Sequence, residues 1–560
     1  MSKVKLMAIT NIDDTILNWR SDKITDCQGF AIERRRIRTS QDSPVVELVN
    51  RVGFAAEAPG PHQTKASSVW PFQRYSWTDH EVSESDVFEY RIVPMIGRPG
   101  ELVKGESFAS DWTVIHAVQP KNGDITCVFN RPLAASQWMA DYAKTHHLET
   151  STGLVNALTS AADDQLRELC GGTLLSKLNE LLLKTIADPG ARLWAALFEL
   201  DDPKIIAHLM ALGSRANVIL ANGASKATSP DENVEARKVL KDAGCVVHDR
   251  MTAPPLGTGG LAHNKFIVFE FPNNDQYVWT GSTNLTVTGL LTQINNGLLI
   301  KSRELAKQYK AQWLLLVTAG DSSPALLKKK NPSPGVIIND PANIEPWFTP
   351  TVKNNDLDRI RQLIDDAKQG ILFLSYMPGP TGPVFDVLDD LANGKFVRGV
   401  INQFVGGRSG KLYAHLVSAK PDDAMHLDVV TPIGIKEAFS YWDKEFTKGG
   451  RISVLVHSKV ICIDAFGDNP VLITGSHNFS SAASESNDEN FVIVQGQKEL
   501  AQAYAVHIYS VYRHYRWRQY VAQTQASGKN PWAKLTSDDS WQDHYINDES
   551  QIQEWTFWGL

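Results

Sequence analysis

Two stretches of the sequence carry the same set of polar residues in the same order. The first is HNKFIVFE followed by TGSTN, and the second is HSKVICID followed by TGSHN. These residues are His263, Lys265, Glu270, Gly281, Ser282 and Asn284 in the first copy, and His457, Lys459, Asp464, Gly475, Ser476 and Asn478 in the second. Every position recurs after 194 residues, so a chance match is a poor explanation.

These residue types suit chemistry on a phosphodiester. In a strand, a histidine and a lysine two residues apart point to the same face, which places an imidazole and an ammonium beside one phosphate. The serine and the asparagine supply neutral hydrogen-bond donors, and the glycine lets backbone approach the ligand closely. One copy makes half a site. Two copies related by a pseudo-twofold axis would hold one phosphate between two histidines, two lysines and two asparagines.

A pair of histidines defines a mechanism in two steps. A neutral histidine can attack phosphorus and form a phosphohistidine, and a protonated histidine can donate to the leaving oxygen and later activate water. The two imidazoles therefore need surroundings that separate their pKa values. Lysines and asparagines stabilise charge on the non-bridging oxygens. We expect no catalytic metal and no cofactor, and the sequence contains no zinc-protease or EF-hand motif.

These two copies resemble the signature of the phospholipase D superfamily, H-x-K-x4-D followed by G-S-x-N. The second copy matches it fully, whereas the first has Glu270 where the family has aspartate. The resemblance covers roughly residues 120–520. It implies a phosphodiesterase with one active site shared by two pseudo-twofold-related halves, in which His263 is the nucleophile and His457 the acid.

A further pair of equivalent positions differs between the copies. Glu489 stands where members of the family place a carboxylate that orients a catalytic histidine, and the equivalent residue in the first copy is Asn295. A carboxylate favours the imidazolium form of a neighbouring histidine more than an amide does. This difference is predicted to separate the two histidine pKa values. The alternative interpretation is that Glu489 only caps a turn.

The elements that must position these residues follow an α/β pattern from about residue 120. Short apolar segments that indicate strands alternate with helical segments: strands at 193–200, 216–223, 245–249, 371–376 and 396–404, and helices at 203–213 and 233–244. This alternation predicts a mostly parallel sheet flanked by helices in each half.

The N-terminal region has a different pattern. Segments 30–38 and 88–95 alternate in side-chain character with period two, which indicates strands. Together with Trp19 and Trp77, they loosely resemble a fibronectin type III β-sandwich, whose expected role is to bind a protein partner or tether substrate. The predicted domains are a β-sandwich at 1–115, phospholipase D-like halves at 120–325 and 336–520, and a C-terminal tail at 521–560 that packs on the core.

Composition indicates a soluble, cytoplasmic protein. The five cysteines are scattered, as expected for free thiols in a reducing compartment. The sequence has no signal peptide and no apolar run of about 18 residues, so no transmembrane segment is predicted. Export by a route that needs no cleavable signal remains open. The net charge of −7 argues against bulk coating of nucleic acid but allows a local basic groove.

Three functions are compatible with these motifs. Nuclease-like hydrolysis of nucleic acid is favoured, because the second motif continues as G-S-x-N-F-S-x-A-A with a downstream N-x-E-N, which resembles the nuclease branch of the superfamily. The first alternative is a phospholipase D that hydrolyses or transfers a phospholipid headgroup. The second is a non-catalytic binding protein that retains a phosphodiesterase site.

Overall fold

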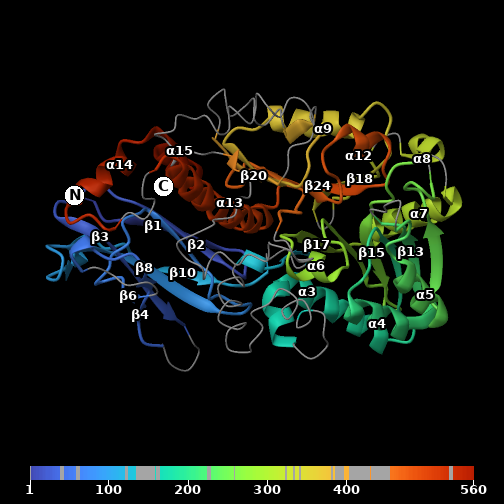
Figure 1. Cartoon of the computed structure of the whole chain (residues 1–560), viewed down its shortest axis with the longest axis horizontal. Helices are drawn as coiled ribbons and strands as arrows, with labels where there is room; N and C mark the ends of the chain where they lie inside the picture. The colour runs from blue at the N-terminus through green and yellow to red at the C-terminus, as the bar shows by residue number, and fades with distance from the viewer. Residues whose placement is uncertain are drawn as a thin grey trace.

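The structure, a computed structural model, describes residues 2–37, 43–57, 63–119, 124–133, 158, 164–223, 229–257, 259–321, 324–331, 334–339, 342–379, 382–384, 396–402, 429–430, 455–528 and 534–560. An N-terminal β-rich region lies at one end of the molecule, and two α/β halves lie beside it (Figure 1).

The N-terminal region contains two main sheets that share one core. The three-stranded sheet consists of β1 (Lys5–Thr10), β2 (Thr15–Arg20) and β7 (Ser76–Asp79). The five-stranded sheet consists of β10 (Thr113–His116), β8 (Val87–Ile96), β3 (Cys27–Arg36), β4 (Val46–Glu47) and β9 (Val103–Lys104). Trp19 from the first sheet packs with Phe30 and Tyr90 from the second. The region is therefore β-rich as expected, and its likeness to fibronectin type III stays a prediction.

The two halves contain seven-stranded sheets with matching strand order. The first sheet runs β11 (Ile125–Phe129), β17 (Asn296–Lys301), β16 (Gln276–Gly281), β15 (Lys265–Glu270), β12 (Arg192–Leu197), β13 (Ala216–Ala221) and β14 (Val246–Arg250). The second runs β18 (Asn343–Phe348), β24 (Asn490–Gln495), β23 (Val471–Gly475), β22 (Val460–Ile463), β19 (Gly370–Ser375), β20 (Phe396–Ile401) and β21 (Val429–Val430). This correspondence confirms the predicted α/β class and its two-half arrangement. The domain boundaries themselves stay predictions.

The sheets are mixed rather than mostly parallel, which corrects the expectation. Strands β12, β13 and β14 pair in parallel, whereas β11, β17, β16, β15 and β12 pair antiparallel in succession. The motif strands β15 and β16 are joined by the short loop 271–275, and a short connection favours an antiparallel pair. The helix–strand alternation predicted the parallel part of the sheet but not these hairpins.

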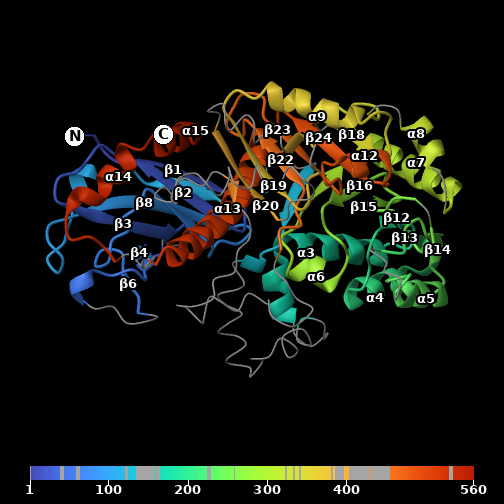
Figure 2. The ribbon, with the colours of Figure 1, turned by 45° about the horizontal axis from the view of Figure 1, so that its top comes forward.

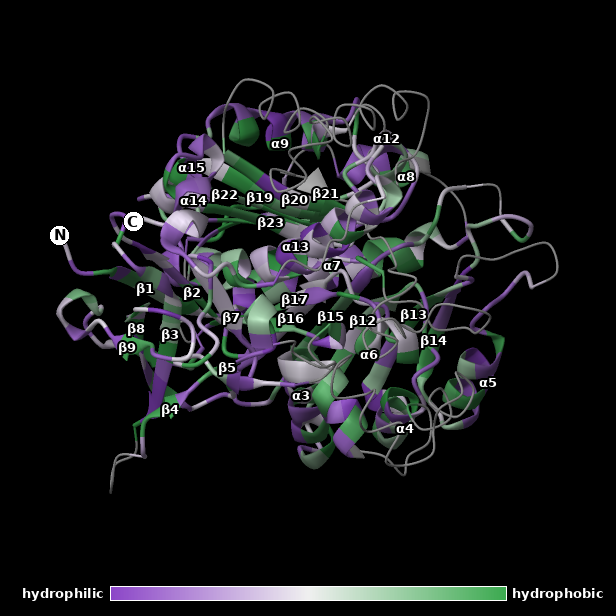
Figure 3. Ribbon diagram, turned by 60° about the vertical axis from the view of Figure 1, so that its left-hand side comes forward, coloured by the Kyte–Doolittle hydropathy of each residue, from purple (hydrophilic) through white to green (hydrophobic). Residues whose placement is uncertain are grey.

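Helices cover the sheets and join the halves. The first half contains α3 (Asp164–Ala187), α4 (Pro203–Leu212), α5 (Val234–Asp242), α6 (Val287–Leu291), α7 (Arg303–Ala319) and α8 (Pro324–Lys330). The second contains α9 (Asn355–Asp365), α12 (Ser481–Glu485) and α13 (Lys498–Ala526). One core joins both halves through Phe266, Tyr309 and Trp313 of the first and Val460 and Tyr504 of the second. The strands of the second sheet are mainly hydrophobic (Figure 3), as expected for strands covered on both faces.

The C-terminal segment packs against the N-terminal region. It contains η5 (Asp539–Gln542), α14 (Asp543–Ile546) and α15 (Glu549–Phe557), which lie beside the N-terminal strands (Figure 2). The indole of Trp541 donates to the Cys27 carbonyl and that of Trp555 to the Trp19 carbonyl, at 2.9 and 2.8 Å. Both tryptophans are buried, and Trp558 reaches the core shared by the halves.

Two further expectations concern whole-chain properties. All five cysteines are free, as predicted, and all five are buried. Within the described ranges, no helix combines the length and apolar character needed to cross a membrane.

Candidate active site

The two histidines of the repeated motif lie at the junction of the halves. His263 precedes β15 and His457 precedes β22, and both side chains are buried. Nδ1 of His263 lies 2.7 Å from Oε2 of Glu489, while Nδ1 of His457 lies 3.1 Å from Oδ1 of Asn295. Each histidine is therefore oriented by a residue of the opposite half.

The backbone repeats this exchange between the halves. The amide of His263 donates to the carbonyl of Asp488 at 2.9 Å, and the amide of His457 donates to the carbonyl of Ile294 at 2.9 Å. Residues 488 and 294 are themselves 194 apart, so the same backbone contact occurs twice. The two motif copies thus form one site around a pseudo-twofold axis.

The motif serines fix the groups that orient the histidines. The Ser476 hydroxyl donates to Glu489, and the Ser282 hydroxyl donates to Asn295, each at 2.7 Å. The Asn295 amide nitrogen donates to the Gly289 carbonyl at 2.8 Å, which directs its oxygen towards His457. Since Nδ1 of each histidine is held, Nε2 is the nitrogen left for a substrate.

The motif glycines are required for strand packing, and not for approach of the backbone to a ligand as the sequence suggested. A Cβ at Gly281 would collide with the backbone of β17, and one at Gly475 would collide with that of β24. Their small size allows close packing of neighbouring strands rather than approach to a ligand.

The two lysines lie in equivalent, buried positions. Lys265 Nζ donates to the His263 carbonyl at 3.1 Å, and Lys459 Nζ donates to the His457 carbonyl at 2.7 Å. The carbonyl contacts hold both ammonium groups beside the histidines, where they can reach the oxygens of a bound phosphate.

Two aromatic side chains that the motifs did not predict line the site. Phe198 packs edge-on against His263 with a centroid distance of 4.6 Å, and Tyr376 packs against His457 at 4.8 Å. The two rings also lie 4.8 and 5.0 Å from the Nζ atoms of Lys265 and Lys459. Phe198 and Tyr376 are separated by 178 residues, not 194, so the motif offset does not reveal them.

The motif asparagines differ in their contacts. Asn284 Nδ2 donates to Oε2 of Glu199 at 2.6 Å. The Oδ1 atoms of Asn284 and Asn478 are buried and find no hydrogen-bond partner among the described residues. An amide oxygen only accepts hydrogen bonds, so it is the Nδ2 groups of these asparagines that can donate to a phosphate oxygen. Glu199 has no counterpart in the motifs.

The acidic residues of the motifs lie away from the histidines. Glu270, the last residue of β15, accepts from Trp194 Nε1 at 2.7 Å and forms an ion pair with Lys310. Asp464, which follows β22, accepts from the backbone amides of 368, 369 and 370. At about 3.3 Å per residue, a strand separates each from its histidine. Glu270 and Asp464 therefore stabilise local structure, as a supporting role requires.

Burial and neighbouring charges shift the pKa values at the site. Burial lowers the pKa of His263 from 6.5 to about 4, although the Glu489 charge opposes the change. Burial, Lys459 and Lys265 lower the pKa of His457 well below 6.5. Burial lowers the pKa of Lys265 to about 8, and burial together with Lys265 lowers that of Lys459 well below 10.5. Both shifts favour the neutral imidazole.

Behind the site, a second repeated pair of residues joins the halves. Asn296 Nδ2 donates to the Thr474 hydroxyl at 2.7 Å, and Asn490 Nδ2 donates to the Thr280 hydroxyl at 2.5 Å. Each asparagine also donates to a buried tyrosine, Tyr504 or Tyr309. Both the asparagines and the threonines recur after 194 residues, so the motif offset was a signal that could have found them.

Fold and site together define a phosphodiester site shared by two homologous halves. A scan against known families matches "Cardiolipin synthase, PLD-like domain" at residues 182–314 and 360–511, which is half of the chain. The chain therefore belongs to the phospholipase D superfamily, as its motifs predicted, and is a phosphodiester-acting enzyme.

Several solved structures are similar to this chain. Phosphatidylserine synthase from Haemophilus influenzae Rd KW20 is 14% identical with a TM-score of 0.41, over 63% of this chain and 90% of that chain. Nuc, a phospholipase D family member from Salmonella typhimurium, is 20% identical with a TM-score of 0.21, over 32% and 95%. Polyphosphate kinase from Porphyromonas gingivalis is 12% identical with a TM-score of 0.37, over 57% of this chain but only 42% of the kinase. A search of curated protein sequences found no match.

Proposed function

We propose that this protein is a metal-independent phosphodiesterase that acts through a phosphohistidine on His263. The observation that carries the proposal is the unequal support of the two histidines. Glu489, a carboxylate, holds His263, whereas Asn295, a neutral amide, holds His457.

A carboxylate suits the nucleophile. When Nε2 of His263 bonds to phosphorus, the imidazole ring becomes positively charged. Glu489 lies 2.7 Å from Nδ1 and stabilises that charge as it develops. Its hydrogen bond also keeps the proton on Nδ1, so that the lone pair of Nε2 faces phosphorus.

A neutral amide suits the acid. Asn295 orients His457 without the charge that would hold a proton tightly, so the protonated ring is a strong donor. A bound phosphate supplies the negative charge that favours protonation of His457. His457 then gives this proton to the leaving oxygen as the bond from phosphorus to that oxygen breaks.

The second step returns the enzyme to its starting state. A water oxygen attacks phosphorus, His457 takes the water proton, and the bond between phosphorus and Nε2 of His263 breaks. In both steps, Lys265 and Lys459 balance charge on the non-bridging oxygens, and Asn284 and Asn478 offer them hydrogen bonds.

We favour nucleic acid as the substrate, on the sequence that follows the second motif. A phospholipid is the second candidate, because the matching family is described as a cardiolipin synthase domain. The N-terminal β-rich region is the proposed contact for a protein partner, and the cytoplasm the proposed compartment, which the buried free cysteines support.

One experiment tests the reaction and the substrate together. Purified protein is offered plasmid DNA and headgroup-labelled phospholipid vesicles in parallel, in excess EDTA, with the double variant His263→Ala, His457→Ala as the blank. We expect the wild type alone to cut the plasmid. Headgroup release with intact plasmid would reverse the substrate order. Activity on neither substrate would favour the second alternative, a binding protein that retains the site.

A further inference from the structure

The site contains a carboxylate outside the two motif copies. Glu199 lies two residues beyond β12, whose Leu197 is paired with Lys265 of β15. This register brings Glu199 to the end of the sheet where the motif histidine and lysine stand. Its side chain is half-buried, and its Oε2 accepts the hydrogen bond from Asn284 Nδ2 at 2.6 Å.

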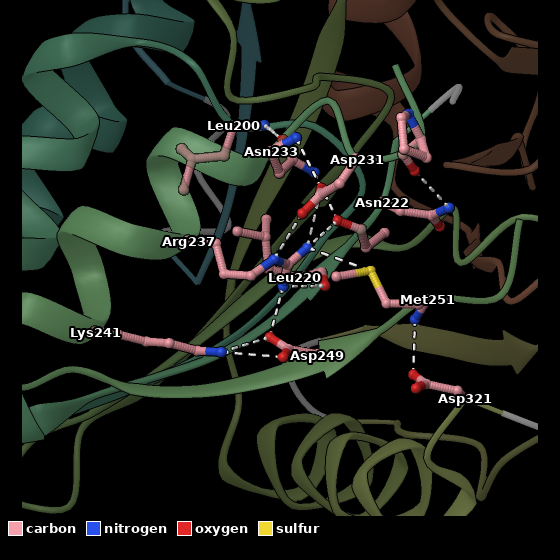
Figure 4. Close-up of polar contacts among 12 residues, drawn as sticks. Leu200, Leu220, Asn222, Asp231, Asn233, Arg237, Lys241, Asp249, Met251 and Asp321 are labelled. Carbon is pink, nitrogen blue, oxygen red and sulfur yellow. Dashed lines mark hydrogen bonds and ion pairs between the residues drawn. The ribbon is translucent and has the colours of Figure 1, made fainter. Parts of the chain in front are cut away.

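The backbone on both sides of Glu199 is held in place. Asn233 Nδ2 donates to the Phe198 carbonyl, and Asn233 Oδ1 accepts from the Leu200 amide, each at 2.9 Å. Asn233 belongs to a polar network with the buried Arg237, shown in Figure 4. The Glu199 carboxylate is therefore fixed by the fold beside the site.

The second half has no equivalent carboxylate. Val460 of β22 is paired with Leu374 of β19, just as Phe266 is paired with Ala196 in the first half. Counting three residues onward from Ala196 and from Leu374, Met377 stands where the first half has Glu199. Both halves contain the motif residues expected to bind phosphate, whereas only the first half has this carboxylate. We therefore look for a role of Glu199 other than binding phosphate.

The charge of Glu199 acts where the phosphate binds. The charges of both Glu489 and Glu199 act on the ammonium groups of Lys265 and Lys459. Glu199 raises the pKa of both lysines against the larger lowering effect of burial, so its field reaches both. It also engages Asn284, which is placed to bind a phosphate oxygen. A phosphate oxygen bound by Asn284 would therefore lie two hydrogen bonds, through Asn284 Nδ2, from the negative charge of Glu199.

We propose that Glu199 makes the site selective for a singly charged phosphodiester over a doubly charged phosphomonoester. Repulsion grows in proportion to the charge of the ligand, so a dianion loses more affinity than a monoanion. Selectivity of this kind keeps free phosphate and monoesters out and speeds the release of a monoester product. The inference rests on the proposed function in one respect, namely that phosphate binds between the two motif copies.

Binding of two small probes tests the proposal on the full-length protein. Calorimetry measures the Kd of dimethyl phosphate and of methyl phosphate at about pH 7.5, where the monoester is mostly doubly charged. In Glu199→Gln, the amide oxygen can still accept from Asn284, so the substitution removes mainly the charge. We expect methyl phosphate to gain about 10-fold more affinity than dimethyl phosphate, the effect of one added unit of ligand charge.

Matched variants separate charge from shape. Glu199→Asp should keep the wild-type preference, and Met377→Gln, a polar change at the equivalent position, should leave it unaltered. Met377→Glu should strengthen the preference for dimethyl phosphate. Equal changes for both probes in Glu199→Gln, or no binding of either probe, would overturn the proposal.

The proposed reaction has a separate readout. A phosphohistidine mapped to His263 with an activated diester tests the mechanism. Absence of this adduct, with the shift in probe preference intact, would refute the mechanism and leave the role of Glu199 standing. The adduct together with an unchanged preference would refute only the role of Glu199.

Discussion

Glu489 in the second half and Asn295 in the first occupy equivalent positions, and each holds the histidine of the opposite half. Their neighbours differ as well: Asp488 precedes Glu489, whereas Ile294 precedes Asn295. Asp488 forms a buried ion pair with Arg250, and its carbonyl accepts from the His263 amide. The backbone frame is thus the same in both halves, while the electrostatic support differs.

This contrast separates two kinds of residue. The groups placed to contact phosphate, namely the histidines, lysines and asparagines, are the same in both halves. The groups behind them differ, and they decide how each imidazole handles a proton. A symmetric frame can therefore perform the asymmetric tasks of nucleophile and acid, because those tasks depend on charge more than on position.

Removal of either histidine should have the largest effect, and the two variants should differ in the step that fails. We expect His263→Ala to lose at least about 10⁴-fold in kcat, because the nucleophile is absent. With a p-nitrophenyl diester, whose leaving group needs little protonation, His457→Ala should instead accumulate phosphohistidine, because water is no longer activated. Intact-mass analysis after a quench detects the adduct. An adduct on His457 in the His263 variant would exchange the two roles.

The Arg250–Asp488 pair should give the next largest effect, on stability. Arg250→Met leaves Asp488 buried without its partner, which costs about 3–5 kcal/mol. Burial already raises the pKa of Asp488 despite Arg250, and removal of Arg250 should raise it further. The variant should therefore lose more stability than the wild type as pH rises from the unfolded value of 3.8 through the folded pKa of Asp488. Urea unfolding measures both effects.

A double variant gives position 488 the isoleucine that the first half has at position 294 and also removes the partner of Asp488. Arg250→Met with Asp488→Ile removes both charges and should recover most of the lost stability. If the double variant is no more stable than Arg250→Met, the loss comes from packing, and the electrostatic contrast at this position is not its cause.

Exchange of the charge at Glu489 and at Asn295, the residues that orient the histidines, should show directly how the two halves differ. We expect Glu489→Gln to lower kcat by about 100-fold, because the charge on the phosphorylated ring is no longer compensated. Glu489 raises the pKa of His263, so its removal should lower that pKa below about 4 and move the acid limb of the kcat/KM profile to lower pH.

Asn295→Asp is the converse change. The added carboxylate should raise the pKa of His457. The limb of the kcat/KM profile that reports His457 should therefore move to higher pH. A structural role alone would lower the rate in both variants without moving either limb.

The two lysines should give the smallest effect. Each has a folded pKa below the unfolded value of 10.5, so the folded state disfavours the charged form and loses stability as pH falls through that interval. Lys265→Met and Lys459→Met should therefore gain about 1–3 kcal/mol at neutral pH while losing activity. The gain should be larger for Lys459, whose pKa Lys265 lowers further.

Urea unfolding at neutral pH and near pH 10 checks this sign. The gain should shrink at the higher pH, where the lysines of the unfolded chain also lose their protons. A gain that is independent of pH would assign the effect to packing.

The sequence by itself determined which side chains of each motif copy share a face. A histidine and a lysine two residues apart, followed by Gly-Ser-x-Asn, recur at one offset, and local spacing along a strand decides which side chains share a face. The alternation of strands and helices predicted two α/β halves, and the family resemblance together with the repeat offset pointed to Glu489 and Asn295. Close pairs on one strand need no knowledge of the rest of the fold.

Only the tertiary structure decided which groups act on which. Glu489 holds His263, 226 residues away, because the halves exchange their orienting residues across the junction. Phe198, Glu199 and Tyr376 follow the ends of β12 and β19, which lie outside the motifs, so the repeat offset does not apply to them. The same holds for the mixed sheets, for the strand packing at Gly281 and for the position of the C-terminal helices. All depend on contacts between distant segments, which local periodicity does not encode.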